Sequence, residues 1–259
     1  MNWLNKFYAF AYRNFIFSKR NFFAFMEILF WPVAGMLSVG IMGSFLELKE
    51  NILSFVLTGA ITAGVLQVTQ LDVSYSLLYD IWSKSVKHTF LAPVNQYDYI
   101  MGSWIIGMAR GAIVFILLVF FSVRAFGFAL AGMHMTIIFL MVIFLSGLIV
   151  GMLVCLLIML FGQRVEVTAW SLAILLMLIC GIYYPVNFLP RLVMSISSAI
   201  PLTYFLEYYG SFYGFVPIFS HSLVKGFGLA AIYVIFLFWF LKRAFERARK
   251  TGMILRLSE

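Results

Sequence analysis

Long apolar runs separated by short polar stretches dominate the pattern of hydrophobic and polar positions along the chain. A helix needs about 20 apolar residues to cross a bilayer, and only helices or closed barrels satisfy their backbone groups in hydrocarbon. Because the runs do not alternate strictly between apolar and polar residues, they predict helices. We therefore predict an all-α integral membrane protein that forms one transmembrane domain with six spans. The predicted spans are about 25–46, 52–78, 99–123, 135–161, 166–185 and 223–241.

The composition supports a lipid environment. The chain of 259 residues is 64% hydrophobic and only 11% charged, whereas soluble domains contain about 25% charged residues. A net charge of +8 could attract nucleic acid. However, the basic residues border the apolar runs, which is typical of topology signals. We expect membrane lipid and no nucleic acid as a partner.

The basic residues also predict the orientation. Most of the eighteen Lys and Arg residues fall on one side if the N-terminus is placed in the cytoplasm. Both ends are then cytoplasmic, in a plasma membrane of the bacterial or archaeal type. The polar segment 80–98 becomes a cytoplasmic loop, and 243–259 becomes a basic cytoplasmic tail. The mixed first twenty residues lack the pattern of a secretory signal peptide.

Residues 1–22 predict an amphipathic helix at the inner membrane surface. Lys6, Arg13 and Arg20 recur every seven residues and share one helical face. The opposite face is largely apolar and consists of Leu4, Tyr8, Ala11 and Phe15. This helix either anchors the chain near anionic headgroups or also forms a platform that contacts a cytosolic partner.

The segment 185–215 is too broken to be a full span. Pro185, Pro190 and Pro201 divide it, and proline disfavours a helical conformation in the residue before it. We predict two short re-entrant helices in the outer leaflet that line or cap a cavity, since irregular backbone at that depth must be covered. The alternative is an interfacial loop rich in aromatic residues.

Charged residues within the spans are expensive and need partners. Glu27 lies near the inner end of the first span, whereas Asp72 and Arg110 lie deep in the second and third. We expect Arg110 to pair with Asp72 or Glu27, either to hold the fold together or as a polar point on a translocation route. The candidate substrate-pathway residues are Asp72, Arg110, Tyr204, Glu207 and Tyr208.

Small residues indicate where helices approach closely. Gly107 with Gly111, and Gly147 with Gly151, form small-xxx-small faces. The two cysteines, Cys155 and Cys180, lie inside apolar runs. We interpret them as lipid-compatible side chains rather than as a disulfide or a metal pair.

Three landmarks carry a resemblance to a known family. Leu29-Phe30-Trp31-Pro32 follows the amphipathic lead-in, Phe90-Leu91-Ala92-Pro93-Val94 ends the polar loop, and Tyr184-Pro185 runs through Leu189-Pro190 to Pro201-Leu202-Thr203-Tyr204. In order and spacing they cover nearly the whole chain, which resembles a type 2 export permease of the ATP-binding-cassette (ABC) transporters. In that family two six-span permeases form the membrane unit, and a coupling helix between spans two and three docks on a separate ATPase.

The resemblance implies a coupling element over Ile81–Ala92, ended by Pro93. One departure is that Lys87 and His88 stand where the family usually has an acidic residue. The resemblance also implies a cytosolic ABC ATPase subunit and a second permease copy, in a homodimer, as partners. The implied ATPase-coupling residues are Asp80, Ile81, Trp82, Lys84, Lys87, His88, Phe90, Leu91 and Pro93.

Sequence motifs for catalysis are missing. No Gly-x-x-x-x-Gly-Lys-Ser/Thr phosphate loop occurs, so ATP and magnesium are expected in the partner and no cofactor or metal in this chain. We expect a non-enzymatic subunit of an exporter that moves a glycan, a lipid-linked molecule or a hydrophobic drug. The alternative is a secondary transporter or channel without an ATPase; an intramembrane hydrolase is a weaker rival because no hydrolase motif is present.

Overall fold

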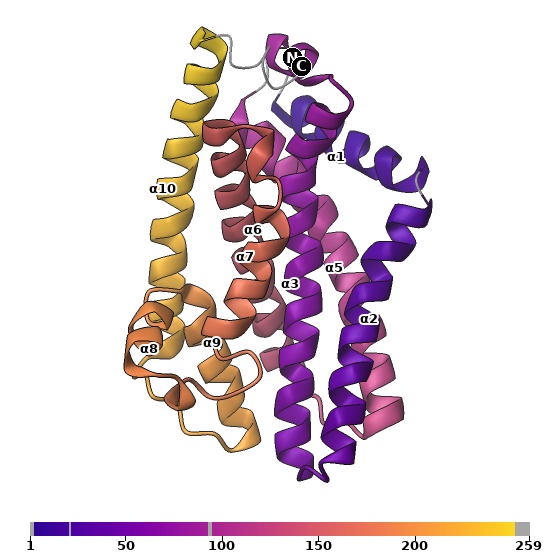
Figure 1. Ribbon diagram of the computed structural model, residues 1–259, viewed down its shortest axis with the longest axis vertical. Coiled ribbons are helices and arrows are strands. Elements are labelled where there is room, and N and C mark those ends of the chain that lie inside the picture. Colours follow the sequence, from indigo (N-terminus) through magenta and orange to yellow (C-terminus); the bar gives the residue numbers. More distant parts are fainter. Residues whose placement is uncertain (1–2, 21, 93–94, 252–259) are drawn as a thin grey trace.

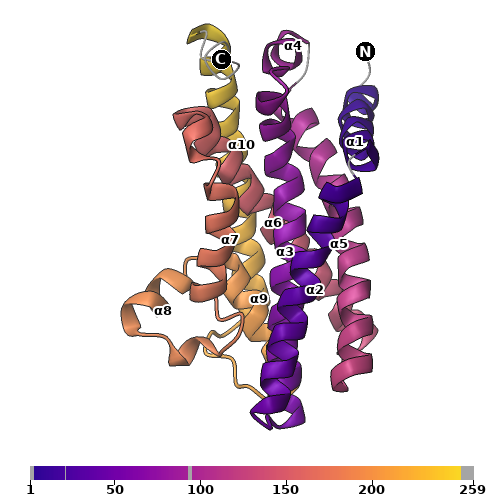
Figure 2. The ribbon, with the colours of Figure 1, turned by 45° about the vertical axis from the view of Figure 1, so that its right-hand side comes forward.

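The computed structural model describes residues 3–20, 22–92 and 95–251. In this part of the chain the regular elements are all helices, arranged side by side in an elongated bundle (Figure 1). The helix α4 and the last turns of α10 lie at one end, here called the α4 end (Figure 2). The long helices are α1 (Trp3–Arg20), α2 (Phe22–Phe45), α3 (Glu50–Trp82), α5 (Gln96–Phe126), α6 (Met133–Phe161) and α10 (Ser222–Thr251). The shorter ones are α4 (Val86–Leu91), α7 (Thr168–Ile179), α8 (Arg191–Ser197) and α9 (Pro201–Gly210), with single 3₁₀ turns η1 (Gln163–Val165), η2 (Val186–Phe188) and η3 (Ser211–Tyr213).

Four helices of the described part are long and apolar enough to cross a membrane, judged by length and composition: α3, α5, α6 and α10. Two further apolar helices are shorter, namely Leu29–Phe45 within α2 and the whole of α7. The all-helical fold and these long apolar helices are those of a membrane protein. They agree with the prediction of an all-α membrane protein.

The helix α3 forms the centre of the bundle and packs against α2, α5, α6 and α7. Glycines on two neighbours make this close packing possible. A Cβ atom added to Gly111 on α5 would lie 2.6 Å from Thr69 Oγ1, and one added to Gly147 on α6 would lie 2.9 Å from Thr69 Cβ. The predicted small-residue faces therefore do contact a neighbouring helix, and both contact α3 at the same level.

Two predicted boundaries near the α4 end differ from the observed ones. The helix α3 continues to Trp82, so the predicted loop from residue 80 begins with the last turn of a helix. The helix α10 continues to Thr251 because Leu241, Phe245 and Ala248 keep a buried apolar stripe. The predicted basic tail is therefore helical up to that residue, and 252–259 lie outside the described residues.

The predicted fifth span is shorter than expected. The helix α7 ends at Ile179, and Gly181 then adopts a left-handed conformation with φ of +73°. The following backbone passes so close to α3 that a Cβ atom on Gly59 would lie 2.0 Å from the Ile182 carbonyl oxygen. The backbone after α7 is therefore not helical, and it packs closely against Gly59 of α3.

The segment after this turn contains two short helices, α8 and α9, as predicted. The helix α9 packs against α6 and α10, and Tyr209 stacks on Phe139 with ring centroids 4.0 Å apart. Cys155 and Cys180 are both free and buried.

Candidate functional site

The predicted coupling segment divides into a buried base and an exposed tip. At the base, Asp80 and Ile81 are only 2% and 3% exposed, because they belong to the last turn of α3. At the tip, Trp82, Lys84 and His88 are exposed. The remaining predicted coupling residues Lys87, Phe90 and Leu91 lie on α4, whereas Pro93 lies outside the described residues.

The base of the loop is a polar network that we call the Asp80 junction, formed by Arg13, Ser76, Asp80, Ser85 and Tyr99. Both carboxylate oxygens of Asp80 accept hydrogen bonds from Arg13 Nη1, at 2.9 and 3.0 Å. The Ser85 hydroxyl donates to Asp80 Oδ1 at 3.0 Å. The Tyr99 hydroxyl contacts the Ser76 carbonyl oxygen and lies 3.1 Å from Asp80 Oδ2. One carboxylate thus joins α1, α3, the turn before α4, and α5.

Aromatic rings extend this junction to α10. The Tyr99 ring lies edge-on to Phe10 of α1, with centroids 5.0 Å apart, and 6.2 Å from the ring of Phe245 on α10. The Arg13 guanidinium lies over both Phe10 and Tyr99, at 4.9 and 5.2 Å from the ring centroids, a cation–π arrangement. Helices α1, α3 and α10 therefore all contact Tyr99 of α5.

The charge of Arg13 is stable in this place. Burial lowers the pKa of the Arg13 guanidinium, but the neighbouring Tyr99 and Asp80 together raise it above its ordinary value. A guanidinium stays protonated in proteins. Arg13 therefore keeps its charge beside Asp80.

The helix α1 corrects one prediction from the sequence. Arg13 was expected on a basic face directed at lipid headgroups. Its side chain instead points inward, because it forms an ion pair with the buried Asp80 of α3. Asn14 is also buried and donates to Ser103 Oγ at 2.8 Å. The outward side of α1 carries the exposed aromatics Tyr8 and Phe15 instead.

The start of α5 fixes the other end of the loop. Asn95 and Asp98 form a capping box, in which the Asn95 backbone N–H donates to Asp98 Oδ2 at 3.1 Å. On the opposite flank, Trp82 Nε1 donates to Glu166 Oε2 at 3.1 Å, which connects α3 to the turn between α6 and α7. The loop is therefore anchored at both ends.

The intramembrane charges form a second site within α3 and α5. Arg110 Nη1 forms an ion pair with Asp72 Oδ1, so Asp72 is the partner among the two predicted candidates. The pair lies at a tight helix crossing, since a Cβ atom on Gly107 would be 2.9 Å from the Thr69 carbonyl oxygen. This geometry favours a role in holding α3 to α5.

Three predicted pathway residues lie on α9. The Tyr204 hydroxyl donates to the Ser198 carbonyl oxygen at 2.7 Å. Glu207 Oε2 accepts a hydrogen bond from the Ile218 backbone N–H at 2.6 Å. Tyr208 is partly buried one residue further. The hydrogen bond of Tyr204 thus joins α9 to the end of α8, and that of Glu207 joins α9 to the backbone before α10.

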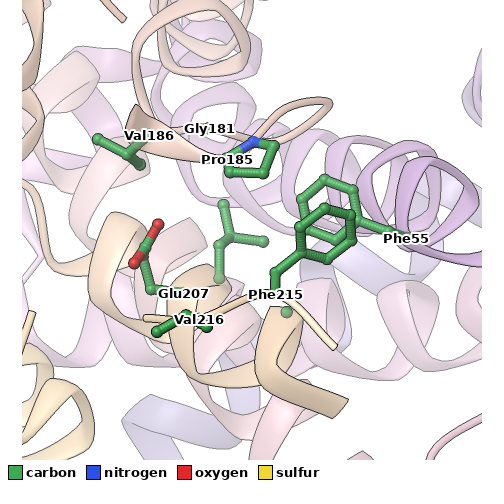
Figure 3. A pocket seen from close by; sticks show the side chains of 9 residues that line it. Phe55, Gly181, Pro185, Val186, Glu207, Phe215 and Val216 are labelled. Carbon is green, nitrogen blue, oxygen red and sulfur yellow. The ribbon is translucent and has the colours of Figure 1, made fainter. Parts of the chain in front are cut away.

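Glu207 also borders a small cavity of about 10 Å³ between α9 and the backbone after α7. Figure 3 shows its carboxylate beside the cavity, with Pro185 and Val186 across from it and Phe55 and Phe215 on the far side. A space of this size holds about one water molecule. The cavity is too small for a transported solute.

The sequence did not single out Ser76, Tyr99 or the inward direction of Arg13. Two signals were available. Ser76 and Asp80 are spaced i, i+4 on one helix face, and Tyr99 directly follows the capping residue Asp98. Neither signal indicates a partner on α1, because the contact between Arg13 and Asp80 joins residues 67 positions apart.

Within residues 3–20, 22–92 and 95–251, no group of three or more His, Cys, Asp or Glu side chains could hold a metal ion. The described side chains therefore provide polar contacts between helices and no assembled metal centre.

The comparisons with known proteins add one relative. No protein-family model matches the chain. An uncharacterized protein of Archaeoglobus fulgidus is 45% identical over 53 residues, which are 20% of this chain and 83% of the archaeal protein. The two proteins belong to one family. Since the relative is described only as uncharacterized, this kinship assigns no activity.

Proposed function

We propose that this protein is the transmembrane subunit of an ATP-driven exporter of the ABC type. In this proposal α2, α3, α5, α6, α7 and α10 are the six spans, and the α4 end faces the cytoplasm of a bacterial or archaeal cell. A second copy completes the membrane unit. A separate subunit hydrolyses ATP with magnesium, and the cargo is a glycan, a lipid-linked molecule or a hydrophobic drug.

The observation that carries the proposal is the attachment of the α4 loop to the Asp80 junction. A soluble motor can move membrane helices through a loop only if the loop does not swing independently of them. Here one buried carboxylate binds α1 through Arg13, the turn before α4 through Ser85, and α5 through Tyr99. A push on the loop would therefore displace several helices together.

The exposed tip supplies a surface for such a motor. Trp82, Lys84 and His88 are accessible around α4, and aromatic and basic groups are common anchors at protein interfaces. A secondary carrier has no need for a rigid handle of this kind outside the membrane. The geometry therefore favours the exporter over the carrier.

Replacement of residues 84–88 by a Gly-Ser linker tests the coupling. The native complex, purified from cell membranes, should contain a stoichiometric ATPase subunit and show ATP hydrolysis stimulated by substrate. The linker variant should lose both. Because the linker also removes Ser85 and the buried Val86, the variant K84E/H88E, which changes exposed side chains alone, should lose both while the permease still folds. As a matched control, a Gly-Ser linker in place of residues 46–49, the exposed turn between α2 and α3, should retain both. Unchanged hydrolysis in the 84–88 variant would refute the coupling assignment.

A labelling experiment tests the orientation. Both native cysteines are buried, so a single cysteine placed at the exposed Ser83 should react only with reagents that reach the cytoplasm. A cysteine at Phe45, which is 83% exposed at the opposite end, should react from outside. The reverse labelling pattern would overturn the proposed orientation, and transport by the purified chain alone would favour a carrier.

A further inference from the structure

A groove with a volume of about 510 Å³ lies between α7 and α10, with α6 as its floor. Both views place α7 and α10 on the same side of the bundle (Figures 1 and 2). Rim residues such as Leu175 and Phe236 are about half exposed, at 48% and 55%. The groove is therefore open along the outer surface of the bundle, where a membrane helix meets lipid.

The lining is almost entirely apolar. Its two hydroxyl groups are already used within the protein: Ser146 donates to the Val142 carbonyl oxygen at 2.7 Å, and Tyr233 donates to the Ala199 carbonyl oxygen at 2.7 Å. The groove thus offers hydrocarbon contacts and no hydrogen bond for a ligand. The part of a ligand that lies inside must be hydrocarbon.

The length of the groove matches one lipid chain. Its floor runs along α6 from Ser146 to Leu156, which is about 15 Å at the rise of an α-helix. This is roughly half of the hydrocarbon thickness of about 30 Å, which corresponds to one leaflet. Ile200 and Pro201, at the start of α9, line the end of the groove that is farther from α4. An acyl chain would therefore enter the groove from the α4 end, from the leaflet on that side.

Basic side chains lie just beyond that open end. Phe240 is the lining residue of α10 nearest to the α4 end. Arg243 and Arg247 follow it by three and seven residues, so they continue the same stripe of the helix. The Arg243 guanidinium lies 3.7 Å from the ring centroid of Trp239, and tryptophan prefers the depth of lipid headgroups.

The third basic group comes from the turn between α6, the floor of the groove, and α7, one of its walls. Arg164 is exposed in η1, between α6 and α7, and this turn lies beside α10 in both views (Figures 1 and 2). The acidic groups nearby are fewer: Glu166 accepts a hydrogen bond from Trp82, and Glu246 is exposed on α10. The mouth is therefore net basic, and guanidinium groups bind phosphate with two parallel hydrogen bonds.

We infer that this groove binds one acyl chain of an anionic phospholipid, whose phosphate contacts Arg243, Arg247 and Arg164. The inference rests on the proposed placement of the bundle in a membrane, but not on the ATPase partner or on the direction of transport. The lipid covers an apolar surface that would otherwise be poorly filled, and it ties α7 to α10.

Native mass spectrometry of the purified full chain tests the site with two defined lipids, phosphatidylglycerol and phosphatidylcholine. The wild-type chain should retain one phosphatidylglycerol through detergent exchange, in preference to phosphatidylcholine. The variant R243Q/R247Q should weaken the binding of phosphatidylglycerol by about tenfold or more, since it removes charge-assisted hydrogen bonds to the phosphate. K225Q, an exposed lysine at the other end of α10, should leave binding unchanged.

A second pair of variants tests the groove itself. Leu175→Trp fills the rim and should abolish retention of the lipid, whereas Leu178→Trp, also exposed on α7 but outside the groove, should not. Both leucines are exposed, so the fold should survive. The proposal would be overturned if the two lipids bound equally or if R243Q/R247Q bound phosphatidylglycerol as well as the wild type does. It would also be overturned if Leu175→Trp displaced a second protein copy and not a lipid, because the groove would then be a protein interface. Loss of the ATPase subunit alone would contradict only the proposed function.

Discussion

Removal of Arg13 should destabilise the protein more than neutralisation of Asp80. With Arg13→Ala, the Asp80 carboxylate stays 2% exposed and keeps only hydroxyl donors, and a buried charge without its partner costs about 3–5 kcal/mol. With Asp80→Asn, the stranded Arg13 side chain is already 23% exposed and can reach solvent. The free energy of unfolding should then fall by about 2 kcal/mol, the contribution of a charge-assisted hydrogen bond.

Reversible unfolding in detergent micelles, followed by circular dichroism, measures these losses. Lys19→Ala is the matched control, an exposed lysine on the same helix, and should change the free energy of unfolding by at most about 0.5 kcal/mol. The double variant of Arg13 and Asp80 should lose less than the sum of the two single variants, by about 1–3 kcal/mol. If Arg13→Ala costs no more than Lys19→Ala, or if the two single variants rank in the opposite order, the junction does not hold the helices together.

Two further predictions concern the centre of the bundle. Gly111→Leu should lower the free energy of unfolding by about 2 kcal/mol or more, because its side chain would collide with Thr69; Gly228→Leu, with open space around its Cβ position, should be nearly neutral in the same micelle assay. Arg110→Leu should cost about 3–5 kcal/mol by leaving Asp72 unpaired, while the double change to leucine at both positions should be more stable than either single change. An unstable double variant would indicate a role for the charges beyond pairing.

The positions of the long helices were predictable because crossing hydrocarbon requires one property that a sequence displays directly, a sufficient apolar length. The ends of the helices were less predictable. The basic residues after Lys242 looked like a solvated tail, although Phe245 and Ala248 continue the apolar stripe that keeps α10 helical. At Asp80, a polar residue looked like the start of a loop, but its burial against another helix overrides that local signal.

The contacts at the candidate site were predictable only where few partners were available. Arg110 had two candidate acids, and the structure pairs it with Asp72. Arg13 had no indicated partner, because heptad spacing describes which residues share a face and not what that face meets. Its inward direction depends on how α1 lies across α3 and α5, which is a property of tertiary packing.

The shortness of α7 has a consequence for the surrounding bilayer. Its 12 residues rise about 18 Å, against a hydrocarbon thickness of about 30 Å. If α7 is the fifth span, as proposed, the rest of this depth is filled either by the buried segment after Gly181, which packs against α3, or by local thinning of the lipid. Where the lipid thins, reconstitution into bilayers of shorter-chain lipids should relieve the mismatch.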